Sequence, residues 1–222
     1  MVATLGICFA LTACNMQKWT ETVHEEYHLI TQKSGATVGY SPKSGLKIIY
    51  VDGYAFKDLN HDGKLDVYED WRQPTEKRVE DLVSKLSTEE IAGLMLYSNH
   101  EAIPATSYDI SNYNGKPYAE SGAKPWNLSD NQKHFLKEDH LRHVLVTIIE
   151  SPEIAARWNN ELQSYVEGLE HGIPANNSSD PRHSARADAE FNAGGGGKIS
   201  QWPGPLGLAA TFSPFLATRR HR

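Results

Sequence analysis

Cysteine is scarce in this chain: among 222 residues there are two, Cys8 and Cys14, and both lie close to the N-terminus. A disulfide between them could not cross-link a distant core, so we expect no disulfide framework. An excess of positive charge is also absent, because 22 Lys and Arg stand against 28 Asp and Glu, giving a net charge of −6. Such a chain lacks the surplus cations that release counterions from phosphates, so nucleic acid is not an expected partner.

Long hydrophobic runs are missing too. The apolar stretch 2–13 is too short to span a bilayer as a helix. It ends at Leu11-Thr-Ala-Cys14, which resembles a bacterial lipobox, where a signal peptidase cuts before a cysteine that then carries lipid. We therefore predict a lipoprotein-type signal peptide at 1–13, lipidation at Cys14, and an exported periplasmic or outer-membrane lipoprotein that meets the membrane only through its lipid anchor. The alternative is an apolar N-terminus without a targeting role, since no Lys or Arg precedes Lys18.

Several catalytic motifs are absent or incomplete. The chain has no G-x-S-x-G motif and no candidate catalytic cysteine. The glycine run before Lys198 is followed by Ile199 instead of Ser or Thr, which favours a flexible loop over a phosphate-binding loop. Residues 24–28 match the zinc-protease motif H-E-x-x-H, with Glu25 as general base, but the β-type residues around them favour a strand. A strand would hold the two imidazoles in a poor geometry for one metal ion.

Composition and hydrophobic periodicity indicate a soluble α/β fold. Residues 14–57 form a polar, strand-rich lead-in, in which runs 37–40 and 46–51 predict a hairpin around the turn cluster 41–45. A helix is expected from Thr75, and a capping-box pattern at 87–90 predicts a second helix. Residues 98–128 lack periodicity and predict a long loop.

The second half of the chain has the pattern of a parallel sheet. A helix is expected over 129–139, followed by an uninterrupted β-branched run at 143–149 that is typical of a strand buried on both faces. An amphipathic stretch at 152–170 predicts a long helix, and 173–176 predict another strand. Strand, helix and strand in this order form a βαβ unit, so the two strands are predicted to be parallel.

Residues 58–70 match the EF-hand calcium loop at every specified position. Gly63 allows the sharp turn, and the closing position supplies two carboxylate oxygens. A hard cation prefers six to eight oxygen ligands, so we predict a structural calcium site; the alternative is an acidic surface turn. The predicted ligands are the side chains of Asp58, Asn60, Asp62, Asp66 and Glu69 and the main-chain carbonyl of Lys64.

A third candidate site follows the predicted strand at 173–176. Asp180 comes a few residues after this strand, and the carboxyl ends of parallel strands are where α/β proteins bind ligands. An ionised aspartate offers two acceptor oxygens that suit paired sugar hydroxyls. Taken alone, this aspartate is also compatible with a turn or a helix cap.

Taken together, the motifs resemble the N-terminal part of glycoside hydrolase family 3, the β-glucosidase type, over about residues 45–212. The resemblance rests on segments at 52–60, 63–71, 78–95, 142–146, 156–160, 172–174, 179–183 and 202–212. It implies a (β/α)8 TIM-type barrel, here incomplete, with 75–222 as a partial barrel domain. It also implies a retaining enzyme that hydrolyses terminal β-D-glycosidic bonds of oligosaccharides or β-glucosides, with no cofactor for the chemistry itself.

The resemblance implies that Asp180 holds hydroxyls of the terminal sugar, with Arg182 and His183 as less certain contacts. The family's nucleophile and acid/base lie later in the barrel, so no catalytic residue is expected in this chain. A (β/α)8 barrel takes about 250 residues, and 75–222 is shorter. We therefore expect an inactive fragment from a truncated or frameshifted gene. The competing interpretation is a non-enzymatic, calcium-stabilised, glycan-binding surface lipoprotein.

Overall fold

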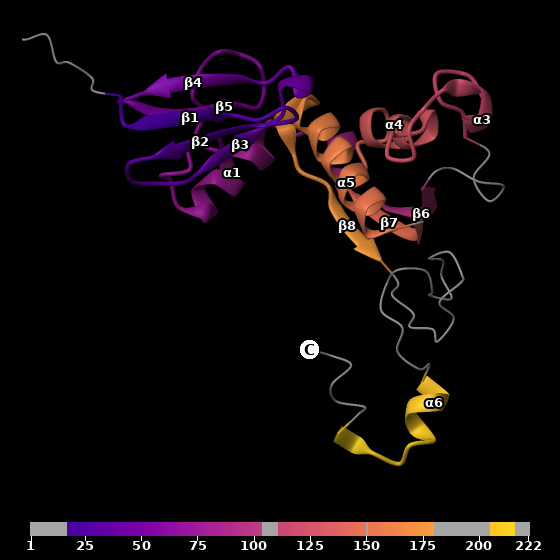
Figure 1. Cartoon of the computed structure of the whole chain (residues 1–222). Coiled ribbons are helices and arrows are strands. Elements are labelled where there is room, and N and C mark those ends of the chain that lie inside the picture. Colours follow the sequence, from indigo (N-terminus) through magenta and orange to yellow (C-terminus); the bar gives the residue numbers. More distant parts are fainter. Residues whose placement is uncertain (1–16, 104–110, 150, 180–204, 216–222) are drawn as a thin grey trace, which may run out of the picture.

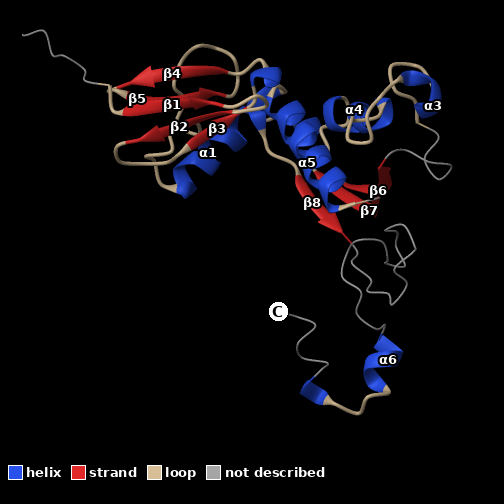
Figure 2. Ribbon diagram, viewed as in Figure 1, coloured by secondary structure: helices blue, strands red, loops and turns tan. Residues whose placement is uncertain are grey.

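The computed structural model describes residues 17–103, 111–149, 151–179 and 205–215. Its strands form three separate sheets, and none of these sheets is closed (Figure 2). The first two sheets come from the lead-in, and the third is parallel and lies beside the longest helix (Figure 1).

The lead-in is antiparallel throughout. Strands β1 (Trp19–Val23), β2 (His28–Gln32) and β3 (Val38–Tyr40) form one sheet, and β4 (Lys47–Val51) pairs with β5 (Tyr54–Asp58) in another. The predicted hairpin between 37–40 and 46–51 is therefore wrong. The turn cluster between them forms a short 3-10 helix, η1 (Pro42–Ser44), that separates β3 from β4.

The β4–β5 hairpin turns through Asp52 and Gly53, with φ of 54° and 82°. Positive φ at both central residues is the geometry of the tightest hairpin turns, and an Asp-Gly pair suits it. Behind this hairpin, Ile30, Val38 and Ala55 form a small buried core. The amide of Gln32 adds two hydrogen bonds to the main chain of Ala55, at 2.9 and 3.1 Å, which join the two lead-in sheets.

Two helices follow the acidic loop. Helix α1 (Thr75–Lys85) begins where predicted, but Val79 and Val83 on its apolar stripe are about half exposed. Helix α2 (Thr88–Leu94) starts with the predicted capping box. The Ser87 hydroxyl accepts the Glu90 N–H, and the Glu90 carboxylate accepts the Ser87 N–H at 2.8 Å.

The third sheet has the order β6–β7–β8 with all strands parallel. Its strands are β6 (Tyr97–Ile103), β7 (His143–Ile149) and β8 (Asn176–Ser179), and helix α5 (Pro152–Glu167) connects the last two. The predicted βαβ unit is thus present, with β7 in the centre of the sheet. The prediction of a loop over all of 98–128 is wrong, because its first residues form β6.

Two boundaries also differ from expectation. Helix α5 ends at Glu167 rather than at 170, and a 3-10 turn, η2 (Glu170–Gly172), follows it. The next strand starts at Asn176 instead of 173. Shorter elements complete the described chain: α3 (Tyr118–Ser121), α4 (Asp130–Lys137) with the capping box of Ser129, and α6 (Pro205–Ala209).

The main core lies between α5 and the parallel sheet. Eight buried apolar residues from α4, β7, α5 and their connections form it: Leu128, Leu136, Leu141, Val144, Val146, Trp158, Leu162 and Val166. None of the helices in the described ranges is both long and apolar enough to cross a membrane.

Candidate functional site

The acidic loop (58–70) begins at the last residue of β5. Asp58 is 1% exposed, and its carboxylate accepts the N–H of Gly63 at 3.1 Å. Gly63 has a φ of 75°, a left-handed conformation that glycine adopts without strain. The side chains of Asn60 and Asp62 each accept a main-chain N–H two residues further on. The sequence thus winds into a tight coil in which polar side chains bind its own backbone.

Glu69 closes the loop. One of its carboxylate oxygens accepts the N–H of Leu59 at 2.6 Å and of Asn60 at 3.3 Å, and the other accepts the N–H of Asp66 at 2.9 Å. The glutamate is 4% exposed, and burial raises its pKa above the ordinary value even though these three N–H groups oppose the shift. A buried carboxylate that is hard to ionise would gain from a nearby cation.

The donor set of the loop fits a hard cation, since every predicted ligand offers oxygen. The carboxylate oxygens of the loop are, however, not gathered around one point. Among the residues that the structure describes, no three of the loop carboxylates bring one oxygen each within 4.8 Å of one another. Asp66, for example, binds the Asn60 amide at 2.8 Å and lies 3.5 Å from the Lys85 ammonium. In this arrangement the loop is held by its own hydrogen bonds.

The residues after the loop fasten it to the hairpin. The Arg72 guanidinium donates to both oxygens of Asp70, at 2.8 and 2.9 Å, and to Asp52 in the β4–β5 turn at 3.1 Å. Burial opposes ionisation of Asp70, but the Arg72 hydrogen bonds outweigh it and lower the pKa of that carboxyl. The loop is therefore anchored at both ends, to β5 and to the hairpin turn.

The residues predicted to bind sugar follow the end of β8 in the sequence. Because the sheet is parallel, the ends of β6, β7 and β8 lie at one edge, and β8 ends at Ser179. Asp180, Arg182 and His183 come directly after it in sequence, and they lie outside the described residues. The signal peptide at 1–13, Cys14 and the glycine run before Lys198 also lie outside them.

Two side chains whose roles sequence reasoning missed hold the segment that leads into β8. Arg142 is buried and donates to three main-chain carbonyls, those of Ile173 (3.0 Å), Leu136 (2.6 Å) and Leu141 (2.9 Å). The amide of Gln163 bonds the main chain of Ala175 in both directions. These contacts fix where β8 enters the sheet, and thereby where the chain leaves it.

The zinc-protease motif does not form a helix. His24 lies in a turn, stacked on Tyr27 with a centroid separation of 4.4 Å. His28 starts β2 and contacts Glu21 and Tyr40 at 2.9 and 3.0 Å. The expected strand forms only at His28, since 24–27 connect β1 to β2, and the two imidazoles have different partners.

A different group of ligand-type residues comes together from distant parts of the chain. In the described ranges, Glu90, Glu170 and His171 each offer one ligand atom within 4.8 Å of the others, and His171 Nε2 lies 3.5 Å from Glu90 Oε1. His171 is buried and has a φ of 63°. Sequence reasoning missed this group because α2 and η2 are about 80 residues apart, and no local motif links them.

Comparison with known proteins gives a consistent set of relatives. A periplasmic beta-glucosidase/beta-xylosidase of Dickeya chrysanthemi is 37% identical over 177 residues, which cover 79% of this chain and 25% of the relative. A probable beta-glucosidase C of Aspergillus flavus is 27% identical over 161 residues, 71% of this chain and 23% of the relative. The beta-glucosidase C of Emericella nidulans is 28% identical over 155 residues, 68% and 22%.

No family model matches the chain. The matched segments nevertheless cover most of its residues, so the homology extends well beyond any one of the motifs described above. The chain spans about a quarter of the length of the curated relatives that it matches.

Proposed function

We propose that this chain, whose partial relationship to glycoside hydrolase family 3 covers most of its residues, is the sugar-holding part of a retaining β-glycosidase. The observation that carries the proposal is the 37% identity over 177 residues with the periplasmic beta-glucosidase/beta-xylosidase. The substrate class is a β-glucoside or β-linked oligosaccharide that is cleaved at its terminal, non-reducing sugar.

The βαβ unit supports this assignment. Strand β8 leads the chain to the edge of the sheet where ligand sites of parallel α/β folds are found, and Asp180 follows its last residue, Ser179, in the sequence. In the proposal, Asp180 accepts hydrogen bonds from sugar hydroxyls, and the parallel sheet belongs to a (β/α)8 barrel. The nucleophile and the acid/base lie outside these 222 residues, so the chain by itself binds but does not hydrolyse.

An assay with a chromogenic β-glucoside tests whether the chain takes part in sugar binding and whether it lacks the groups for hydrolysis. The purified chain is assayed alone, and also as a chimera in which it replaces the matching segment of the Dickeya chrysanthemi enzyme. We expect no turnover from the chain alone and measurable turnover from the chimera. Asp180→Ala in the chimera removes charge-assisted hydrogen bonds to the sugar, so kcat/KM is expected to fall at least about a hundredfold.

The unsubstituted chimera serves as the control for folding, and Asp188→Ala, a nearby aspartate without an assigned role, controls for loss of charge. Retaining turnover by the isolated chain would contradict the division of binding and chemistry. Oligosaccharide binding by the chain, combined with an inactive chimera, would instead favour the non-enzymatic glycan-binding lipoprotein.

We further propose that the acidic loop (58–70) holds a structural calcium ion. The support is the complete pattern of oxygen donors, the left-handed glycine at the sharp turn, and the buried carboxylates of Asp58 and Glu69 at the two ends of the loop. Calorimetric titration of the EDTA-treated chain is expected to show uptake of one calcium ion, abolished in Glu69→Ala. Heat changes that persist in this variant would place calcium elsewhere.

Export is the remaining proposal. The relative from Dickeya chrysanthemi is periplasmic by name, and Leu11-Thr-Ala-Cys14 has the lipobox pattern. Labelling with a radioactive fatty acid during expression in a bacterium is expected to mark the wild-type protein and to leave Cys14→Ser unlabelled. Equal labelling of both proteins would exclude Cys14 as the lipid anchor.

A further inference from the structure

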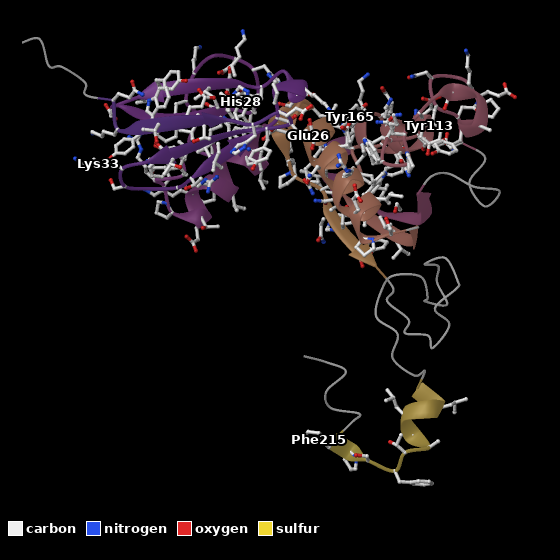
Figure 3. The ribbon with its side chains drawn as sticks, in the orientation of Figure 1. Glu26, His28, Lys33, Tyr113, Tyr165 and Phe215 are labelled. Carbon is white, nitrogen blue, oxygen red and sulfur yellow. The ribbon has the colours of Figure 1, made fainter. Side chains whose placement is uncertain are left out.

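A groove of about 580 Å³ lies where the lead-in meets helix α5. Four polar contacts join its two sides. Lys43 Nζ lies 2.6 Å from Glu161, Lys57 pairs with Glu167, the N–H of Ser41 donates to Glu167 at 3.2 Å, and Arg157 lies 3.4 Å from Glu26. Figure 3 labels Glu26 at this junction. The groove is therefore part of a fixed contact between two regions of the chain.

The groove lies near the start of β8, whereas the predicted sugar-holding aspartate comes in sequence after the end of this strand at Ser179. Its floor includes the second half of α5 together with Gly172 and Pro174, which precede β8. Asp180 follows the other end of that strand. The whole of β8 thus separates the groove from Ser179, the last described residue before Asp180.

The charges that line the groove cancel. Three carboxylates and three cations take part, and each is paired across the groove or along the helix: Glu26, Glu161 and Glu167 with Lys43, Lys57 and Arg157. A lining of this kind offers no net attraction to an anion or a cation. It suits a neutral ligand that can bind polar groups, because charged ligands would lose hydration without a compensating partner.

Some of the described polar side chains in the groove make no hydrogen bond to another protein group. In the described part of the chain, the Tyr27 hydroxyl, the Asn160 amide and the Ser164 hydroxyl make no hydrogen bond. Each of these groups both donates and accepts, as a sugar hydroxyl does. Asn160 and Ser164 are one turn apart on α5, so they face the groove together.

The groove is also lined by an exposed aromatic ring, that of Tyr27. Tyr27 is 47% exposed, and one face of its ring is stacked on His24, which leaves the other face for a ligand. The electron-rich face of an aromatic ring attracts the C–H groups of a flat sugar ring, while the hydroxyls at the rim of the sugar point away from it. The groove spans α5 from Arg157 to Glu167, about 15 Å, which is long enough for several linked sugar rings.

We propose that this groove is a second carbohydrate site, which holds a neutral, β-linked oligosaccharide away from the site of Asp180. The choice of a β-linked sugar rests on the proposed function, whereas the neutral, polar character of the ligand rests on the lining itself. Such a site would keep the enzyme on a polymeric substrate between cleavage events.

Isothermal titration of the full chain with a β-1,4-linked gluco-oligosaccharide tests the proposal. Tyr27→Ala removes the stacking surface and Asn160→Ala removes a polar contact, and each is expected to weaken binding about tenfold. The matched control is Tyr50→Ala, since Tyr50 is 53% exposed and stacked on Trp19 but does not line the groove. Asp180→Ala is expected to remove any binding at that aspartate and to leave the part of the binding that depends on Tyr27 and Asn160 unchanged. Melting curves recorded by circular dichroism verify that each variant is folded.

Different outcomes separate the two proposals. Binding that is lost in Asp180→Ala and kept in Tyr27→Ala would overturn the second site and leave the proposed function intact. Absence of binding to gluco- and xylo-oligosaccharides alike would also overturn it. Tighter binding of an anionic polysaccharide would contradict the neutral character of the groove. An inactive chimera with intact groove binding would count against the proposed function alone.

Discussion

Different interactions hold together the lead-in strands β1–β5 and the parallel β6–β7–β8 unit. In the lead-in, three buried apolar residues form the core, and side-chain hydrogen bonds to the main chain join the sheets. In the parallel unit, eight buried apolar residues pack between α5 and the sheet. The first region relies on polar contacts around a small core, and the second relies on apolar burial.

The segment between the two regions carries much exposed apolar surface. Large exposed apolar side chains occur in α1, in α2 and up to the start of β6, where Met95 at the end of α2 is 82% exposed, and again at 206–215, where Phe212 is 93% exposed. Exposed apolar groups that adjoin one another often mark a contact surface. Buried and exposed apolar side chains are thus distributed unevenly along the chain, and substitutions can measure how far the two regions depend on one another.

The largest effect is expected at Trp158, which is 2% exposed in the core of the parallel unit. Trp158→Ala removes a large buried side chain and leaves a cavity, so the free energy of unfolding is expected to fall by about 3–5 kcal/mol. Hydrogen exchange then separates the regions. Amides of β7 and β8 are expected to lose protection, while those of β1 and β2 keep it. Uniform loss would mean that the chain has a single cooperative core.

A somewhat smaller effect is expected at Arg142. Burial lowers the pKa of this guanidinium, which stays charged and binds three carbonyls. Arg142→Met leaves these acceptors without their donor, so stability is expected to fall by about 3 kcal/mol in urea unfolding. The matched control is Arg157→Met, whose surface ion pairs are worth about 0–1 kcal/mol. Equal losses in both variants would mean that the position of β8 does not depend on Arg142.

Calcium is expected to act on the lead-in side. If the acidic loop holds the ion, calcium at about one hundred times its dissociation constant raises the free energy of unfolding by about 2.7 kcal/mol. Thermal unfolding with calcium and with EDTA measures this, and Asp58→Ala is expected to abolish the difference. A calcium effect of the same size in this variant would contradict the site.

The same loop gives the calcium-free protein a pH dependence. Because burial raises the pKa of Glu69, the folded chain binds this proton more tightly than the unfolded chain does. The contribution of this group to stability is therefore complete at pH values below the ordinary glutamate pKa. It is lost as the pH rises through the raised pKa of the folded state. The free energy of unfolding is measured at several pH values in the wild type and in Glu69→Gln. We expect it to fall with rising pH more steeply in the wild type than in the variant. Parallel curves for the two proteins would contradict this.

The smallest effect is expected at Lys43, whose side chain is largely exposed although it contacts Glu161 on α5. Lys43→Ala is expected to cost less than about 0.5 kcal/mol, because water screens exposed ion pairs. A double-mutant cycle with Glu161→Ala measures the coupling between the two regions directly. A coupling energy above about 1 kcal/mol would show that the lead-in and α5 are more tightly joined than their exposed charges suggest.

Sequence patterns predicted those elements whose ends are marked by local chemistry. The capping-box pattern at Ser87 located α2, the helix expected over 129–139 matches α4, and the β-branched run located β7. The pairing of the lead-in strands was not predicted correctly. The turn cluster 41–45 suggested a hairpin, whereas the Asp52-Gly53 pair formed one. The Asp52-Gly53 pair closes the hairpin because it permits positive φ at two successive residues, which a two-residue turn requires.

The candidate sites were predictable to different degrees. The oxygen donors of the acidic loop are close in sequence, so their spacing alone revealed the motif. The contacts of Arg142 and the group formed by Glu90, Glu170 and His171 depend on how distant segments pack, and no local pattern encodes them. Strand β6 was missed because its residues, from Tyr97 to Ile103, are mostly polar, although they pair with a buried strand.

The two-residue turn at Asp52 and Gly53 also bears on the order in which the chain folds. Val51 pairs with Tyr54 across this turn, whereas His143 must find Asn176, more than thirty residues further along. A short hairpin closes within about 1–10 μs, while a parallel pair waits for its whole crossover. In a chain that emerges N-terminus first, β4 and β5 are therefore in place before β7 and β8 can meet, and the acidic loop starts from an already formed strand end.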